Sequence, residues 1–323
     1  MDMITHLHQH IIQSHILTKL DGRSLVVAGC SSSHLQSLCS DHNLWSNICS
    51  SNWPSTKHPL VTNTIVNFTS GHRSFFSDVF PSPSHHLTTT TTSLPTSHII
   101  SSIDLRYQNH IVFSKVVSTY TGPNDSFQSS PFRIDLLEPK ELVQTELKVS
   151  SHDDHAMQMS LEKHMTLSWI MIDPIQNRAV NVSSLKPVSV QRNWLTDELE
   201  LTFAIVMVVN DHEYVKCNVE VVCGVNGDGF DQLYVSVMSM TVQDINGKCL
   251  NGKDSMVILQ GLMAVERRRC NGDGDGEKER YGEYLQRRKQ KREEMEMRER
   301  RLDLVRVVCG VTFLMTFWSL ALY

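Results

Sequence analysis

The feature of this 323-residue sequence that most constrains its fold is a change in the spacing of apolar residues near residue 99. Before that point, apolar residues recur every three to four positions, as along one face of a helix. From Ile99 to about Val265 they are largely β-branched and alternate with polar residues, which is typical of strands. Helices followed by a β-rich segment predict an α+β fold.

The β-rich segment, residues 99–265, contains five runs with the composition and alternation of strands. Turn-forming residues separate them, such as Asp173-Pro174 and Asn226-Gly227-Asp228-Gly229. Strands at this spacing favour an antiparallel sandwich or curled sheet. Since no fixed repeat period is present, we expect no kelch, WD40 or leucine-rich array. The five predicted strands are residues 110–117, 167–172, 199–209, 214–221 and 233–240.

The N-terminal segment predicts a small bundle of short helices. Ile12, Ile16 and Leu20 have the i, i+4, i+8 spacing of one helix face. We expect Asp21-Gly22 to end this helix, with Gly in the left-handed conformation of a helix C-terminus. Further helices are expected over 24–30, after the Ser31–Ser33 cap and after Asp41. About 40 residues bury too little area to be stable alone, so an exposed apolar stripe suggests a partner surface. The alternative is that these residues simply form the core of a small helical domain.

Several strings in this region resemble known sequences. Three strings resemble the F-box: Ile16-Leu17-Thr18-Lys19-Leu20-Asp21-Gly22-Arg23-Ser24-Leu25, then Leu38-Cys39-Ser40-Asp41, and then Leu44-Trp45. F-boxes often open with Leu-Pro, where this chain has His8 and Gln9. Three further segments resemble a plant subfamily of F-box proteins: the continuation Cys49-Ser50-Ser51-Asn52-Trp53-Pro54-Ser55, residues 167–174 and residues 187–195.

The resemblance implies that residues 8–55 are a three-helix F-box that binds a Skp-type adaptor. The adaptor would link the chain to a cullin scaffold and so to ubiquitin transfer. By matching positions, seven residues are expected to bind the adaptor: Ile12, Ile16, Leu17, Leu20, Leu25, Leu44 and Trp45. The chain would then be the non-catalytic substrate-recognition subunit of a ubiquitin ligase, with its target bound by residues 99–265.

The target itself is not implied by these motifs. Arg192 and Trp194 are candidate target-binding residues, because Trp and Arg dominate binding hot spots. The alternative is that Trp194 fills the core and Arg192 is a solvated neighbour. Two other functions stay open: a membrane-tethered interaction protein that uses its F-box outside a ligase, and a β-sandwich that binds a small ligand or glycan.

The remaining segments are predicted from composition. Residues 56–98 are rich in Ser, Thr, Pro and His and predict a flexible linker, with one ordered patch between Val66 and Val79. Residues 266–301 predict a charged, solvated helix. Residues 302–323 are apolar enough for a transmembrane tail of about 20 residues, or for a helix that packs on the β-domain. The neighbouring Arg300 and Arg301 favour the cytoplasmic or nuclear side for the bulk of the chain, tail-anchored in an intracellular membrane if the tail spans it.

Other functions are disfavoured. A net charge of −5 proposes no nucleic-acid partner, and the eight cysteines include no C-x-x-C pair, which indicates reduced thiols. No signal peptide is visible. The sequence has no Gly-x-Ser-x-Gly elbow, P-loop or dinucleotide fingerprint, so we expect neither an enzyme nor a cofactor. We also expect no metal site at three metal-like clusters, namely His6, His8, His10 and His15, then residues 152–155, then residues 271–276.

Overall fold

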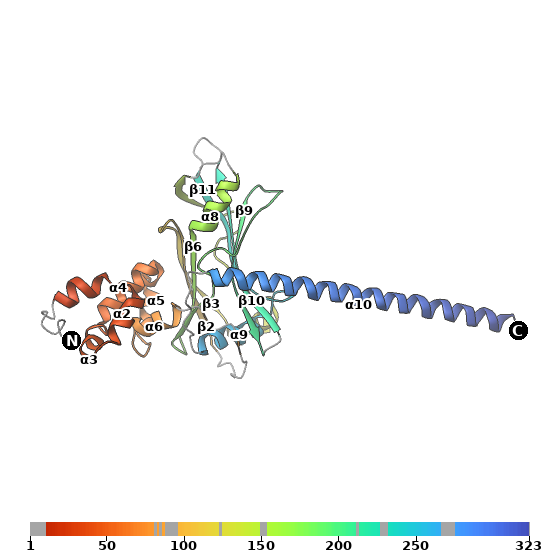
Figure 1. Cartoon of the computed structure of the whole chain (residues 1–323), viewed down its shortest axis with the longest axis horizontal. Coiled ribbons are helices and arrows are strands. Elements are labelled where there is room, and N and C mark those ends of the chain that lie inside the picture. The colour runs from red at the N-terminus through yellow and green to blue at the C-terminus, as the bar shows by residue number, and fades with distance from the viewer. Residues whose placement is uncertain are drawn as a thin grey trace.

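The computed structural model describes residues 11–80, 83, 86–87, 96–122, 125–148, 154–210, 213–226, 232–265 and 275–322. Helices formed by residues 11–80 lie at one end, two β-sheets occupy the middle, and one long helix leaves the opposite side (Figure 1). The α+β class predicted from the change in apolar spacing is therefore confirmed.

Short helical segments make up the N-terminal region, and capping side chains set where several of them begin. Asp21, Ser32 and Asp41 each accept a hydrogen bond from a backbone N–H in the first turn of the helix that follows. The predicted caps at Ser31–Ser33 and Asp41 are thus present. The segments are η1 (Ile12–Ile16, a π-helical turn), η2 (Leu17–Lys19), α2 (Gly22–Gly29), α3 (Ser33–Leu38), α4 (His42–Asn52), η3 (Pro54–Lys57), α5 (Pro59–Ile65) and α6 (His72–Val79).

The break at Asp21-Gly22 has a different cause from the one predicted. The chain turns extended at Leu20, and Gly22 is the first residue of α2 rather than a left-handed residue that ends a helix. A Cβ atom on Gly22 would lie 2.2 Å from Cζ of the Phe76 ring. Glycine is needed there because an aromatic ring from α6 packs against the backbone.

The flexible linker expected over residues 56–98 must be corrected in its first part, because η3 and α5 occupy most of residues 54–65, whereas the ordered patch expected between Val66 and Val79 is present and contains α6. Phe75, Phe76 and Val79 of α6 are buried against Trp45 and other core residues of the N-terminal helices. Burial of these large side chains outweighs a polar local composition. The runs predicted to be mobile, at 81–82, 84–85 and 88–95, lie outside the described residues.

The β-region consists of two sheets. The four-stranded sheet has the order β3-β2-β6-β7, and the seven-stranded sheet has the order β1-β9-β10-β11-β4, with β8 beside β9 and β5 beside β11. Among the described strands, β1 alone pairs in parallel. The first sheet contains β2 (His98–Tyr107), β3 (His110–Tyr120), β6 (Met165–Asp173) and β7 (Arg178–Asn181). The second contains β1 (His86–Leu87), β4 (Arg133–Asp135), β5 (Val143–Lys148), β8 (Ser189–Arg192), β9 (Leu199–Val209), β10 (Glu213–Asn226) and β11 (Gln232–Asp244).

All five predicted strands are present. Residues 199–209 are β9, and the other four predicted runs lie within β3, β6, β10 and β11. The remaining described helices are α7 (Asp125–Ser129), α8 (Asp154–His164), α9 (Gly252–Ala264) and α10 (Asp275–Ala321).

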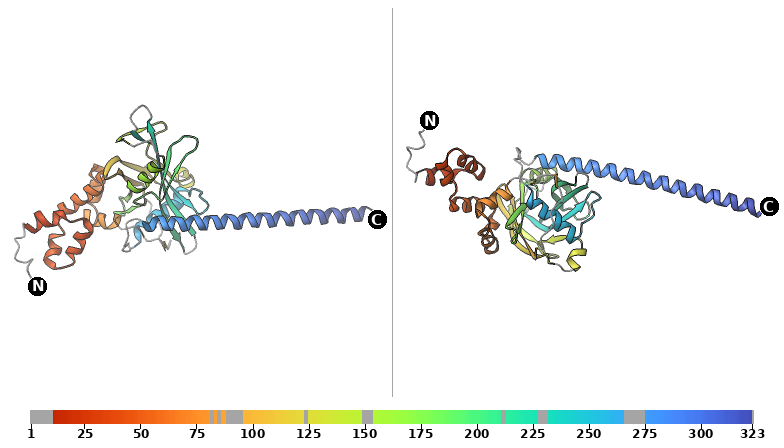
Figure 2. Two further views of the ribbon diagram at one scale, coloured as in Figure 1. Left: turned by 45° about the horizontal axis from the view of Figure 1, so that its top comes forward. Right: turned by 90° about the horizontal axis from the view of Figure 1, so that it is seen from below.

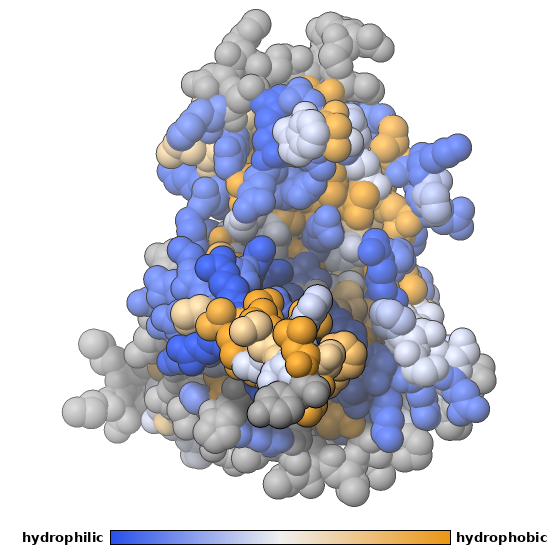
Figure 3. All heavy atoms as spheres, turned by 90° about the vertical axis from the view of Figure 1, so that its right-hand side faces the viewer, coloured by the Kyte–Doolittle hydropathy of each residue, from blue (hydrophilic) through white to orange (hydrophobic). Residues whose placement is uncertain are grey.

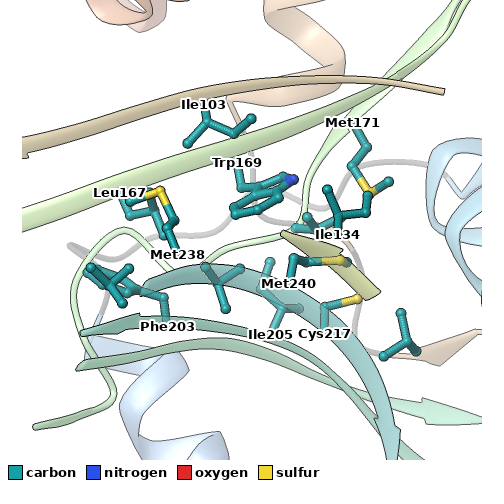
Figure 4. Packing of buried hydrophobic residues seen from close by; sticks show 14 of the residues in the cluster. Ile103, Ile134, Leu167, Trp169, Met171, Phe203, Ile205, Cys217, Met238 and Met240 are labelled. Carbon is teal, nitrogen blue, oxygen red and sulfur yellow. The ribbon is translucent and has the colours of Figure 1, made fainter. Parts of the chain in front are cut away.

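The main core lies between the two sheets. Trp169 of β6 points from the four-stranded sheet toward Phe203, Ile205 and Met240 of the seven-stranded sheet (Figure 4). The Trp169 side chain is fully buried, and its indole N–H donates to the Ser101 hydroxyl at 3.3 Å. These two inward-facing layers confirm the predicted sandwich.

The outer faces of the sandwich carry the two ends of the chain. On the four-stranded sheet, Ile100, Ile170 and Ile172 join the same core cluster as the N-terminal helices. On the seven-stranded sheet, Tyr284 of α10 packs with Val206 and Ile245. The views in Figure 2 agree that the N-terminal helices and the free end of α10 point away from opposite sides of the sandwich.

Candidate interaction surfaces

Most of the residues predicted to bind an adaptor are core residues of the helical unit formed by residues 11–80. Trp45 is buried, its indole N–H donates to the Cys39 carbonyl at 2.7 Å, and its ring lies 5.3 Å from that of Phe76. Five of the seven are at most 7% exposed: Ile12, Leu17, Leu25, Leu44 and Trp45. These five positions hold the helices together.

The other two predicted residues are accessible. Ile16 is 45% exposed, and Leu20 packs at the edge of the core. Three more aliphatic side chains face solvent, and sequence reasoning did not select them: Ile11, which directly precedes η1, and Val26 and Val27 of α2. Burial of Leu25 in α2 could have pointed to Val26 and Val27, because residues one and two positions along a helix are turned by about 100° and 200° from it. We refer to Ile11, Ile16, Val26 and Val27 as the exposed aliphatic set.

The helical unit is fixed to the sandwich through a buried carboxylate. Asp104 of β2 accepts hydrogen bonds from the Ser55 hydroxyl at 2.5 Å, from the Ser55 N–H at 3.1 Å and from the Ser114 hydroxyl at 2.8 Å. Burial raises the pKa of the Asp104 carboxyl, although these hydrogen bonds act in the opposite direction. The Trp53-Pro54-Ser55 string therefore has a structural role, since Ser55 is the side chain that reaches the sheet.

Two arginines complete this junction. Arg106 of β2 donates to the Ser51 carbonyl at 2.7 Å. Arg178 of β7 forms an ion pair of 2.9 Å with Asp78 of α6, and the same carboxylate accepts the Ala179 N–H at 3.1 Å. With contacts at both η3 and α6, the helical unit and the sandwich are held in one orientation.

Trp194 lies on the turn between β8 and β9 and is 87% exposed. Its neighbour Leu195 is 73% exposed. Arg192 forms a two-pronged ion pair with Asp197 across the turn, with both N–O distances 2.7 Å. Asn193 shapes the turn further, because its side-chain oxygen accepts the Leu195 N–H at 2.9 Å. The alternative in which Trp194 fills the core is wrong, and the alternative in which Arg192 is merely solvated is replaced by a role in shaping the turn.

Helix α10 has two parts with different surroundings. Its beginning is held on the seven-stranded sheet, where the Tyr284 hydroxyl donates to the Asp244 carbonyl at 2.9 Å. Lys216 of β10 lies 5.6 Å from the ring centres of both Tyr281 and Tyr284. Burial lowers the pKa of this lysine to about 8.

The far end of α10 contacts nothing in the described chain. It contains an apolar stretch with the length and composition of a membrane span, none of which is buried. Viewed end-on, it forms a cluster of hydrophobic side chains at the front of the molecule (Figure 3). The alternative in which residues 302–323 pack on the β-domain does not match this arrangement of residues 302–322.

The described residues contain no group of three or more His, Cys, Asp or Glu side chains placed to hold a metal. The His6, His8 and His10 cluster, residues 152–153 and residues 271–274 lie outside the described part. The described cysteines are free thiols, and burial raises the pKa of Cys49, Cys217 and Cys223 to about 12. Thiols of that kind are poor nucleophiles at neutral pH.

Comparisons with known proteins agree with the resemblance seen in the sequence. No protein-family model and no solved structure matches the chain. The Arabidopsis thaliana "F-box protein At2g27310" is 41% identical over 328 residues, covering 99% of this chain and 97% of that protein. "F-box protein At3g44326" is 38% identical, covering 97% and 88%, and "Probable F-box protein At2g36090" is 39% identical, covering 96% and 90%; both are also from Arabidopsis thaliana. Because the similarity runs through the helical unit, the sandwich and α10 alike, this chain belongs to the plant F-box protein family.

Proposed function

We propose that this chain is the substrate-recognition subunit of a Skp–cullin–F-box ubiquitin ligase. The observation that supports this best is the exposed aliphatic set, which leaves four branched side chains in water on a unit whose other large apolar residues are mostly buried. Family membership indicates the partner, a Skp-type adaptor held on a cullin scaffold. The chain would accelerate ubiquitination by proximity, holding a protein target near the charged conjugating enzyme.

The seven predicted adaptor residues divide into two groups under this proposal. Ile16 and Leu20 would contact the adaptor directly, together with the other three residues of the exposed aliphatic set. The five buried residues would support that surface from below, so their substitution would act through folding rather than through lost contacts.

Co-purification of the tagged full chain from plant cells tests the proposal. Val27 and Val66 offer a matched pair, since their side chains are 64% and 63% exposed, and Val27 lies in α2 whereas Val66 directly follows α5. Wild type and Val66→Asp should bring down both adaptor and cullin, and Val27→Asp should bring down neither. Equal capture by the two variants would refute the proposed surface. Adaptor without cullin in the wild-type sample would refute the ligase role and favour a function outside a ligase.

For the target, we propose that the β8–β9 turn is a contact point, with Trp194 as its anchor. Its aromatic ring is large, its backbone is fixed by the Arg192–Asp197 ion pair, and it costs little entropy to immobilise. Proximity labelling from the full chain, compared between wild type and Trp194→Ala, should lose a subset of labelled proteins while adaptor labelling stays constant. An unchanged set of labelled proteins would exclude this role.

For localisation, we propose that residues 302–323 anchor the chain in an intracellular membrane, with the sandwich on the cytoplasmic or nuclear side. A helix that is apolar on all sides and unburied requires a lipid or protein cover. The wild-type chain should stay in the membrane pellet at alkaline carbonate, and a chain ending at Arg301 should be released. Release of the wild type would exclude the anchor without affecting the adaptor proposal.

A further inference from the structure

Strand β3 is the long open edge of the four-stranded sheet. It has 11 residues and pairs with β2 on one side. Strand β5 and the η3 turn also contact β3, but no ladder joins either of them to it. Within the described part of the chain, no backbone hydrogen bond other than the β2 ladder engages residues 110–120.

The other edges of the sandwich are protected in ways that β3 is not. Helices α6 and α9 pack against β7, the opposite edge of the same sheet. The outer strands of the seven-stranded sheet, β1, β4, β5 and β8, have two, three, six and four residues. Short or covered edges are the usual means by which β-proteins avoid pairing with other chains. A long edge that no further strand pairs with among the described residues is therefore a candidate for pairing with another chain.

The register of β2 with β3 shows which backbone groups of β3 face outward. The Thr121 N–H donates to the Ser97 carbonyl at 2.9 Å, so residues 97 and 121 form a hydrogen-bonded pair. In an antiparallel ladder, bonded and non-bonded pairs alternate. Since Ile99 pairs with Thr119 and His98 with Tyr120, the N–H and C=O groups of residues 114, 116, 118 and 120 point away from β2.

The side chains along this edge suit an extended peptide. Val116 and Val117 are half-buried and could pack against side chains of an added strand, and Ser118 is exposed and small. Lys115 donates to the Leu136 carbonyl at 2.5 Å and forms no ion pair within the described residues. An acidic side chain on the added strand would complement it. A second copy of β3 would instead bring a second lysine to the same seam, which disfavours self-pairing.

We propose that the β3 edge, residues 114–120, binds an extended segment of another protein as an added strand, with an acidic residue beside Lys115. The strand addition itself is independent of the proposed function. Only the further statement, that the bound segment belongs to the protein recruited for ubiquitination, rests on the proposed function. Main-chain hydrogen bonds would supply affinity, and the side chains beside Lys115 and Val116 would supply selectivity.

A matched pair of substitutions at Ser118 tests the main-chain contact. Ser118→Pro and Ser118→Ala both remove the hydroxyl, but only proline also removes the outward N–H, and proline is tolerated at sheet edges. The probe is a phage library of random 12-residue peptides, selected on the purified full chain in detergent. Selected peptides should be enriched in Asp or Glu and should bind Ser118→Ala as tightly as wild type. Binding to Ser118→Pro should be about tenfold weaker or worse.

Hydrogen exchange of the wild-type chain keeps the proposal testable if Ser118→Pro fails to fold. The amides of Val116, Ser118 and Tyr120 should exchange fast in the free chain and slowly with a selected peptide. Three results would overturn the proposal: slow exchange at these amides without peptide, peptides that bind both Ser118 variants alike, or a failure to select peptides. Protection that grows with protein concentration, together with a dimer in sedimentation, would assign the edge to a second copy instead. If the chain binds the adaptor through Val27 but binds no peptide, the proposed strand site is refuted and the proposed ligase role is not.

Discussion

Asp104 is the residue on which the junction between the helical unit and the sandwich depends. It is 2% exposed and its carboxylate receives bonds from both Ser55 and Ser114, yet burial still raises its pKa. Within the described chain this buried carboxylate has hydroxyl partners but no ion pair, and the charge of Arg106 offsets its burial only in part, so the junction is specific but carries an electrostatic cost. Because of this cost, the free energy of unfolding of the chain should depend on pH.

The first prediction concerns that pH dependence. Because the folded-state pKa of Asp104 lies above the unfolded value, the folded chain binds more protons across the interval between the two. This carboxyl therefore lowers the free energy of unfolding as pH rises through the interval, with no further change above it. Asp104→Asn cannot titrate, so its stability relative to wild type should rise from pH 4 to pH 7. Urea unfolding at a series of pH values measures this, and parallel profiles would contradict it.

The second prediction concerns Gly22. A Cβ atom there would meet the Phe76 ring at 2.2 Å, so Gly22→Ala should destabilise the helical unit by about 1–3 kcal/mol. Gly282→Ala is the control, because a Cβ on Gly282 meets nothing within 4 Å in the middle of a helix. That substitution should be neutral or stabilise by up to about 1 kcal/mol. Thermal unfolding of both variants should show opposite or unequal shifts; equal shifts would argue against the close packing of α6 on α2.

At the scale of elements, the β8–β9 hairpin and strand β6 each carry one tryptophan in opposite surroundings. Trp169 is fully buried between the sheets, whereas Trp194 is 87% exposed on a turn that the Arg192–Asp197 ion pair shapes. The sequence shows both in β-rich surroundings, and only the structure separates a core residue from a candidate anchor.

The third prediction uses this contrast. Trp194→Ala should change the free energy of unfolding by less than about 0.5 kcal/mol, because it removes few contacts. Trp169→Ala should cost about 3–5 kcal/mol, because it leaves a cavity between the sheets. Denaturant unfolding of the two variants measures the difference. A large loss of stability in Trp194→Ala would mean that the turn packs against the protein and is not a free anchor.

A strand could be predicted with its correct bounds where both the strand pattern and the turn residue that ends it are clear. Residues 199–209 alternate and end at Asn210, which adopts a positive φ, and the predicted strand matches β9. Residues 56–65 were predicted poorly, because their polar composition indicated a linker where the chain forms η3 and α5. The ordered patch between Val66 and Val79 was predicted, but its partners were not: Phe76 packs against Trp45 and Phe75 against Trp53, each over 20 positions away. Local composition carries no record of such long-range contacts.

At the scale of the whole molecule, the two ends of the chain lie on opposite faces of the sandwich. The helical unit covers the four-stranded sheet, and α10 leaves from the seven-stranded sheet (Figure 1). If the adaptor binds the helical unit and the apolar end of α10 enters a membrane, the sandwich lies between them. The β3 edge and Trp194 would then be presented in the space between ligase and membrane.

The candidate surface was only partly predictable for a physical reason. Helical periodicity groups Ile12, Ile16 and Leu20, but the same spacing serves residues that face the core and residues that face a partner. Only the packing of the helical unit decides that Ile12 joins the buried core cluster and Ile16 does not. Val26 and Val27 became candidates once Leu25 was seen to point inward.

The central claim, that the exposed aliphatic set binds a Skp-type adaptor, is tested most directly by the affinity of purified components. The full chain in detergent is titrated with a purified adaptor by calorimetry, for wild type, Val27→Asp and Val66→Asp. We expect saturable binding for wild type, an unchanged Kd for Val66→Asp and a Kd at least about tenfold higher for Val27→Asp, with all three chains equally folded. No binding by the wild type, or equal affinities for the two aspartate variants, would contradict it.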